Sequence, residues 1–307
     1  MSFSGDVKEE LSRNLNKARH CQIAEFAAIL HFCGAIVTGK NGETELHLMA
    51  ENTAVWKKCF TLLKKTFNIK TLCDEENPSY TIKITNSEDV WNIFHAVKLI
   101  GEDGVFRGFN EPIHPILLKS TCCKRAFLRG AFLCIGSMSD PAKGYHLELV
   151  AGKERQALQL QGVLRDFELD AKIVKRKQYF VVYLKEGSNI VDFLNICEAH
   201  VGLMSFENFR IVKEVRNSVN RRVNCEAANI KKTVNAATKQ IQDIELLRDV
   251  YGFANLPDNL REMAEVRLEY PDATLKELGQ YLSPPVGKSG VNHRLRKLSE
   301  LAEDIRR

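Results

Sequence analysis

The feature that most constrains this chain is a helical segment that occurs twice, about one hundred residues apart. The first copy reads AEFAAILHFCGAIV and the second reads RAFLRGAFLCIGSM. When Gly34 and Gly136 are aligned, apolar residues match, and a small residue, Ala28 or Gly130, occupies the same position in each copy. Because a missing side chain lets helix backbones approach closely, this pattern predicts that the two helices pack directly against each other.

The repetition extends well beyond these two helices. Alternating segments, ELHLMA and HLELVA, follow the two copies and are typical of strands. Matching helical segments, then the strands SYTIKIT and QYFVVYL, then the apolar helices VWNIFHAV and IVDFLNIC follow in the same order. We therefore predict a duplicated α+β unit, with repeats over about residues 20–105 and 122–205 and an αββαββα pseudo-twofold arrangement.

The paired helices resemble the LAGLIDADG motif of homing endonucleases, which occurs twice in single-chain members. In that family an acid just before the last glycine binds the catalytic metal, whereas this chain has Cys33 and Ile135 there. Phosphodiester hydrolysis on such a scaffold needs hard oxygen ligands for magnesium, which a thiol and an aliphatic side chain do not supply. We therefore expect a chain that is not an enzyme, with no cofactor and no metal site; an active nuclease is the less favoured alternative.

The composition narrows the classes of protein to which this chain can belong. The chain is 44% hydrophobic and 27% charged, and no apolar run approaches the 18 residues expected of a membrane-spanning helix. The N-terminal MSFSGDVKEELSRN lacks the features of a secretory signal and instead predicts a short amphipathic helix. Nine cysteines without a C-x-x-C pair disfavour a disulfide framework or a zinc ribbon. Cys33 and Cys134 are predicted to be small buried hydrophobes, and the location is predicted to be cytoplasmic, away from any membrane.

Positive charge is concentrated near the C-terminal part. Residues 210–307 hold 18 basic and 14 acidic side chains, whereas residues 1–209 hold 26 and 25. Within residues 210–239 there are eight basic and only two acidic side chains. A basic stripe on a nearly neutral body indicates nucleic-acid binding, and a solvated helix face is the alternative. We place the domain boundary so that residues 1–217 form the duplicated domain and 218–307 a helical domain.

A long amphipathic helix is predicted from Val223, because apolar residues recur from there in steps of three and four. Basic and amide side chains at its start suit contacts with DNA phosphates or with adenine. Asparagine caps on a solvated helix start are the alternative interpretation. The predicted DNA-contacting residues in this stretch are Arg221, Arg222, Asn224, Asn229, Lys231 and Lys232.

Three shorter helices follow. Pro257 is expected at the first position of one helix, and Thr274 with Glu277 forms a capping box that opens the next. Ser289 is the expected N-cap of the third helix. The third helix has a basic polar first half, as the recognition helix of a helix-turn-helix requires. Its predicted DNA-facing side chains are Lys288, Asn292, His293, Arg294, Arg296 and Lys297.

A degenerate LAGLIDADG body joined to a helix-turn-helix resembles the WhiA family of bacterial sporulation and cell-division regulators. Three segments carry this resemblance: HPILLKSTCCKRAFLRGAFLCIGSMSDPAKGYHLEL, VNRRVNCEAANIKK and PPVGKSGVNHRLRKLSELA. It implies a sequence-specific transcription regulator linked to sporulation, cell division and chromosome segregation, with a helix-turn-helix similar to domain 4 of sigma factors. The resemblance implies that the residues contacting bases in the DNA groove are Ser289, Asn292, His293, Arg294, Arg296 and Lys297.

The resemblance also sets expectations about partners and location. Double-stranded DNA is the expected partner. The candidate protein partners are RNA polymerase, a sigma factor or another regulator. The expected location is the nucleoid. The alternative is a scaffold that docks on the transcription or division machinery, for which DNA binding is incidental.

Overall fold

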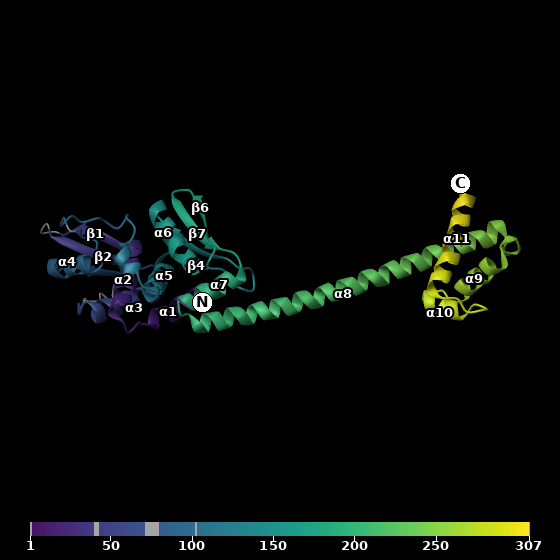
Figure 1. Cartoon of the computed structure of the whole chain (residues 1–307), viewed down its shortest axis with the longest axis horizontal. Helices are drawn as coiled ribbons and strands as arrows, with labels where there is room; N and C mark the ends of the chain where they lie inside the picture. Colours follow the sequence, from purple (N-terminus) through teal and green to yellow (C-terminus); the bar gives the residue numbers. More distant parts are fainter. Residues whose placement is uncertain (1, 40–42, 71–79, 102, 307) are drawn as a thin grey trace. The chain divides into compact units, whose positions relative to one another are not determined.

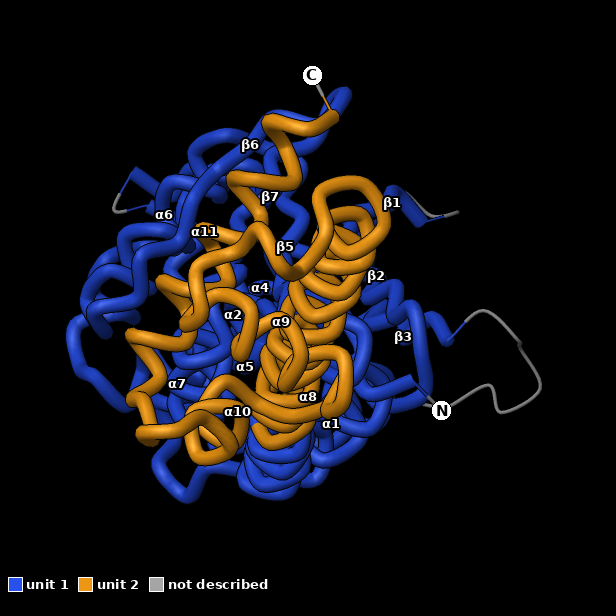
Figure 2. Tube along the Cα trace, turned by 90° about the vertical axis from the view of Figure 1, so that its right-hand side faces the viewer, with its two compact units in different colours: residues 1–214 blue, residues 215–307 orange. Residues whose placement is uncertain are grey.

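The computed structural model describes residues 2–39, 43–70, 80–101 and 103–306. The chain divides into two compact units, residues 1–214 and 215–307, which are coloured separately in Figure 2. The predicted boundary between residues 217 and 218 and the boundary of the compact units both fall within one long helix, α8 (His200–Leu246). Among the described residues, no helix is both long enough and apolar enough to span a bilayer.

Two helices of matching length form the centre of unit 1 (Figure 1). They are α2 (Arg19–Cys33) and α5 (Thr121–Ile135), and each ends at the aligned glycine. The predicted close approach is confirmed, because a Cβ atom on Gly130 would lie 2.5 Å from the Glu25 carbonyl oxygen and 2.9 Å from the Ala28 Cβ atom. Only glycine fits at this crossing without displacing the neighbouring backbone.

The first half of unit 1 surrounds α2. Its sheet is antiparallel with the order β1-β2-β3, and the buried side chains of Leu46 and Leu48 face the core while Glu45 and His47 face away. The αββαββα pattern requires another strand just before β3, and that position overlaps residues 71–79, outside the described residues. The elements of this half besides α2 are α1 (Phe3–Arg13), β1 (Gly34–Thr38), β2 (Thr44–Met49), α3 (Thr53–Thr66), β3 (Thr81–Ile84) and α4 (Ser87–Ala96).

The second half has the complete predicted order around α5. Its four-stranded antiparallel sheet has the order β4-β5-β7-β6, and Leu149 pairs with Val182 on the buried face. Together with the first half, this confirms a duplicated α+β fold. The elements of this half besides α5 are a 3-10 turn (Pro115–Leu118), β4 (Gly136–Met138), β5 (Leu147–Ala151), α6 (Glu154–Arg165), β6 (Lys172–Arg176), β7 (Tyr179–Leu184) and α7 (Gly187–Ile196).

A buried ion network crosses the interface between the two central helices. The Glu25 Oε1 atom lies 2.9 Å from the Lys58 Nζ atom and 3.0 Å from the Arg129 Nε atom, and all three side chains are fully buried. Arg129 also reaches the Glu198 carboxylate at 2.7 Å. Because removing one partner leaves an uncompensated charge in the interior, such a network makes the helix pairing specific.

The long helix α8 begins earlier than the sequence pattern predicted. Its first free amides, of Val201 and Gly202, donate to the Glu10 carboxylate at 2.8 and 2.9 Å, which places an anion at the positive helix start. The prediction of a start near Val223 is therefore wrong. The helix continues through the basic stretch, so Arg221 and Arg222 lie inside it rather than in a loop before it.

Unit 2 gathers three short helices around its own apolar core. Leu260, Met263, Leu278, Val291 and Leu295 are buried together in it. The described elements that follow α8 are a π-helical turn (Leu247–Tyr251), a 3-10 turn (Phe253–Asn255), α9 (Asp258–Glu269), α10 (Leu275–Gln280) and α11 (Lys288–Arg306).

The helix starts of unit 2 test three sequence predictions. The Thr274–Glu277 capping box is confirmed. Pro257 is the N-cap of α9 rather than its first residue. Ser289 is not an N-cap, because the Gly287 carbonyl already accepts hydrogen bonds from the amides of Gly290 and Val291, so that α11 begins at Lys288.

We predict that Gly130→Ala lowers the free energy of unfolding of unit 1 by about 1–3 kcal/mol, because the added methyl group forces α2 and α5 apart. Urea unfolding followed by tryptophan fluorescence measures this unit selectively, since both tryptophans, Trp56 and Trp91, lie in it.

The matched control is Gly162→Ala on α6, where an added Cβ meets no atom within 4 Å. Alanine has the higher helix propensity, so this control should be neutral or stabilising by up to about 1 kcal/mol. Equal stability of the wild type and Gly130→Ala would contradict the proposed role of the crossing.

Candidate nucleic-acid interface

Helices α10 and α11 and the turn between them form a helix-turn-helix arrangement within unit 2 (Figure 1). The turn folds back on α10, because the Val286 amide donates to the Gly279 carbonyl at 2.9 Å. A Cβ atom on Gly279 would lie 2.0 Å from the Val286 carbonyl oxygen. Glycine is therefore required at this position for the prolyl turn to pack against α10.

Helix α11 presents polar side chains on the face opposite its buried seam. Val291, Leu295 and Leu298 are buried, and they hold the helix against the rest of unit 2. The first turns thus expose a set of donors and cations of the kind that reads base edges in a major groove. The exposed predicted residues are Lys288, Ser289, Asn292, His293, Arg296 and Lys297.

The two predicted arginines of α11 differ in their surroundings. Arg294 is largely buried and ties α11 to α9, because its NH1 atom lies 3.6 Å from the Glu262 carboxylate and donates to the Asn259 carbonyl at 3.4 Å. Arg296 is exposed and pairs with Glu300 one turn later, at 2.9 Å. Arg294 therefore orients the helix in this structure, while Arg296 retains an exposed guanidinium.

The basic stretch of α8 is exposed on every face. All residues from 214 to 236 are solvent-exposed, including the predicted Arg221, Arg222, Asn224, Asn229, Lys231 and Lys232. Arg222 pairs with Glu226 at 3.1 Å, and Arg221 donates to the Asn217 carbonyl at 3.3 Å. These residues follow the surface of one helix, so they form a stripe of exposed basic and amide side chains.

A groove of about 550 Å³ within unit 2 brings several of these residues together. Lys232 comes from α8, Lys276 from α10, and Lys288 with Asn292 from α11. No acidic residue is among those that line it. Arg267 of α9 also lines it; its NH1 group donates to the Ala273 carbonyl at 2.7 Å, while its buried Nε atom has no acceptor among the described residues.

The ends of α2 and α5 are where a LAGLIDADG nuclease holds its metal. Cys33 is buried there and Ile135 is half-buried. The prediction that Cys33 and Cys134 are buried is confirmed, and burial raises the pKa of the Cys134 thiol well above its ordinary value. Magnesium prefers oxygen ligands, which neither Cys33 nor Ile135 supplies.

The sheet surfaces of unit 1 carry charges of both signs. The Glu45 carboxylate lies 2.8 Å from the His47 imidazole on β2, and the Glu148 carboxylate lies 3.2 Å from the His146 imidazole and 3.6 Å from the Arg176 guanidinium. These carboxylates place negative charge on the sheet surface. This surface therefore lacks the uniform positive character of the groove in unit 2.

Models of known protein families match residues in both units. The WhiA N-terminal LAGLIDADG-like domain matches residues 19–87, and the WhiA LAGLIDADG-like domain matches residues 124–216. The WhiA C-terminal HTH domain matches residues 219–302. A protein of Lachnoclostridium phytofermentans named "Probable cell division protein WhiA" is 51% identical over the whole of both chains. The chain belongs to the WhiA family.

Further relatives and a solved structure agree with this assignment. The WhiA protein of Alkaliphilus oremlandii is 47% identical and covers 99% of this chain and 98% of its own. The crystal structure of full-length DUF199/WhiA from Thermatoga maritima matches with a TM-score of 0.60 at 25% identity, covering 99% of each chain. The family resemblance found in the sequence and the predicted fold class are therefore confirmed.

The structure places two further basic residues of unit 2 in the candidate interface, neither of which was predicted from the sequence. Lys276 of α10 and Arg267 of α9 line the basic groove together with Lys288. The sequence signal was weak because α9, α10 and α11 approach only in the folded unit.

We predict that Gly279→Ala disrupts the packing of the turn against α10, because the added methyl group collides with the Val286 carbonyl. A destabilisation of about 1–3 kcal/mol corresponds to hydrogen exchange between about 5- and 150-fold faster for the amides of α10 and α11. Hydrogen-exchange mass spectrometry of the full chain measures this directly.

Gly287→Ala is the matched control, since an added Cβ there meets no atom within 4 Å. Equal protection of α10 and α11 in the wild type and Gly279→Ala would show that the turn does not depend on this glycine.

Proposed function

We propose that this WhiA-family chain is a sequence-specific DNA-binding transcription regulator linked to cell division, sporulation and chromosome segregation. The observation that carries the proposal is the basic groove of unit 2. It joins the polar start of α11 to cations from three other helices, without an acidic group among them. Such a concave cationic surface concentrates positive potential where a phosphate backbone can bind.

The groove and the face of α11 have complementary tasks in this proposal. Lys232, Lys276 and Lys288 bind phosphates and set the register of the protein on the duplex. Asn292 and His293, exposed on the first turns of α11, contact base edges in the major groove.

The biological setting follows from the family. The relatives are named probable cell division proteins, which supports a regulator acting on division. The links to sporulation and chromosome segregation come from the family resemblance of the sequence. A DNA-binding regulator of this kind acts in the cytoplasm, at the nucleoid.

The duplicated unit is proposed to be a non-catalytic scaffold. Cys33 and Ile135 supply no oxygen ligand where cleavage needs one, so the chain is not an enzyme in this proposal. Incubation of the full chain with supercoiled plasmid and magnesium should leave the plasmid intact. Saturable nicking that is lost when the protein is heat-denatured would restore the nuclease alternative.

A second function has one observation in its favour. Valines and isoleucines along the start of the unit 2 part of α8 are exposed, namely Val215, Val219, Val223, Ile230 and Val234. An exposed apolar row on a helix is typical of a protein-binding face. In this alternative the chain docks on RNA polymerase, a sigma factor or another regulator, and DNA binding is incidental.

Removal of groove cations tests the proposed function. We predict that Lys276→Ala combined with Lys288→Ala weakens binding to genomic fragments selected by the full chain. The slope of log affinity against log salt should become shallower by about 0.9 for each lost phosphate contact. Gel-shift titrations at several salt concentrations measure both effects.

The charge-matched control is Arg248→Ala combined with Arg261→Ala, which also removes two cations from the same unit outside the groove; their guanidiniums pair with Asp249 and Asp258. If the groove variant keeps the affinity and salt slope of the wild type, the groove does not bind DNA, and docking through α8 becomes the favoured function.

Base reading is tested separately. We predict that Asn292→Ala costs about 1–3 kcal/mol at a selected site and leaves binding to unrelated DNA nearly unchanged, because a base contact carries specificity while phosphate contacts do not. Competition gel shifts with selected and scrambled fragments measure the difference. An equal loss on both fragments would place Asn292 on the backbone instead.

A further inference from the structure

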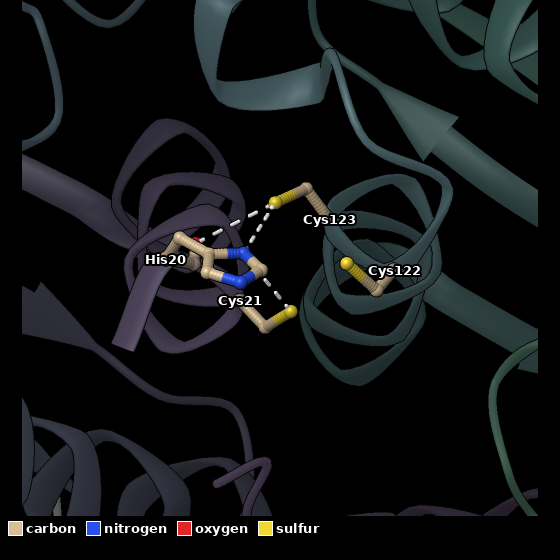
Figure 3. A group of neighbouring side chains, drawn as sticks. All are labelled: His20, Cys21, Cys122 and Cys123. Carbon is tan, nitrogen blue, oxygen red and sulfur yellow. Dashed lines mark hydrogen bonds between the residues drawn. The ribbon is translucent and has the colours of Figure 1, made fainter. Parts of the chain in front are cut away.

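Four metal-binding side chains converge at the starts of the two central helices. His20 and Cys21 lie in the first turn of α2, and Cys122 and Cys123 lie in the first turn of α5. The potential ligand atoms all lie within 4.8 Å of one another. Figure 3 shows the four side chains pointing toward one another from the two helices. Among the described residues, this is the one such group of three or more histidine, cysteine or acidic side chains.

The duplication explains why these residues meet. His20 and Cys122 each stand 14 residues before the glycine that ends their helix, and Cys21 and Cys123 each stand 13 residues before it. The two pairs are therefore equivalent positions of the repeat. Because α2 and α5 pack around a local pseudo-twofold axis, equivalent residues near that axis approach each other. Spacing within one segment does not indicate this group, because its members come from two segments about one hundred residues apart.

The donor set matches zinc in both chemistry and geometry. Three thiols and one imidazole, without a carboxylate, suit a borderline-soft ion and not magnesium or calcium. Zinc bonds of about 2.3 Å to sulfur and about 2.0–2.1 Å to nitrogen place tetrahedral ligand atoms about 3.5–3.8 Å apart. The His20 Nδ1 atom already lies 3.1 Å from the Cys123 sulfur and 3.4 Å from the Cys21 sulfur.

The two helix starts favour bound thiolates. Coordination to a dication deprotonates thiols outright, so a bound ion would hold the three sulfurs as thiolates. Neither helix has an acid in its first turn or a side-chain N-cap bond, so thiolates there also supply the negative charge that a helix start favours.

An ion can reach the four side chains from solvent, and helix packing holds two of them in place. Cys21 and Cys123 are buried against small residues including Ala24 and Ala126, whereas His20 and Cys122 are exposed. The exposed pair gives an ion a route from solvent, and the buried pair fixes the site against the helix packing.

We propose that His20, Cys21, Cys122 and Cys123 bind one zinc ion that joins the N-terminal ends of α2 and α5. Four protein ligands leave no open coordination position, so the ion is structural. It lies at the opposite ends of the same helices from Cys33 and Ile135, so it is unrelated to nuclease chemistry. The proposed zinc site and the DNA groove lie in different units, so the two proposals do not depend on each other.

Metal analysis of the full chain tests the proposal. Elemental mass spectrometry of protein purified without chelator should give about one zinc ion per chain. A variant with Cys21, Cys122 and Cys123 all replaced by serine should contain almost none. The control Cys225→Ser, which changes an exposed cysteine of α8, should keep the wild-type ratio.

A spectroscopic measurement covers the case in which the triple variant fails to fold. Cobalt(II)-loaded wild type should show the intense red-region absorption of a tetrahedral site together with thiolate charge-transfer bands in the near ultraviolet. His20→Cys should keep the tetrahedral bands and strengthen the charge-transfer bands. Cys122→Ser, at an exposed position, should bind at least about 10-fold more weakly.

Three results would overturn the proposal: wild-type zinc no higher than in the triple variant, a cobalt spectrum without tetrahedral bands, or an equal loss of zinc in Cys225→Ser. A disulfide between Cys21 and Cys122 in anaerobically isolated protein would also overturn it, because the cluster is then a redox pair.

Discussion

The close crossing of α2 and α5 is the constraint on which unit 1 depends. The missing side chain of Gly130 brings the α5 backbone against the Glu25 carbonyl of α2. At that separation Glu25 reaches Lys58 on α3 and Arg129 on α5, and Arg129 in turn reaches Glu198 just before α8. One backbone contact thus sets the position of charges from four segments. Their burial makes any other pairing of the halves costly, because it would leave an ion without its partner.

The same crossing determines what the scaffold can do at each of its ends. At the C-terminal ends of the helices it brings together Cys33 and Ile135, which carry no hard ligand for a catalytic ion. At the N-terminal ends it brings together equivalent residues of the repeat, three of which are cysteines. The duplicated unit therefore keeps a LAGLIDADG-like fold. Its side chains lack the oxygen ligands of a catalytic ion at one end of the helices and supply the proposed ligands of a structural zinc ion at the other. In unit 2, by contrast, the cations gather in a groove.

Those parts of the fold that depend on local or periodic signals were predictable from the sequence. The repeated helices, the small residues at their crossing and the Thr274 capping box each follow from residues close in sequence or in equivalent repeats. The start of α8 was missed because its cap is Glu10, which is distant in the sequence. The DNA-contacting residues remain predictions. Their sequence pattern did not show that Arg294 packs on Glu262, nor that Lys276 joins Lys288, because both depend on how the helices of unit 2 approach.

The central claim is that unit 2 reads DNA while the duplicated unit serves as a scaffold. Photocrosslinking in the native bacterium tests it most directly, with a photoreactive amino acid placed in the full chain at position 292 on α11 or at position 83 on the polar face of β3. We predict that crosslinks from position 292 map to discrete chromosomal sites and that those from position 83 do not. Discrete sites captured from position 83, with none from position 292, would contradict the account.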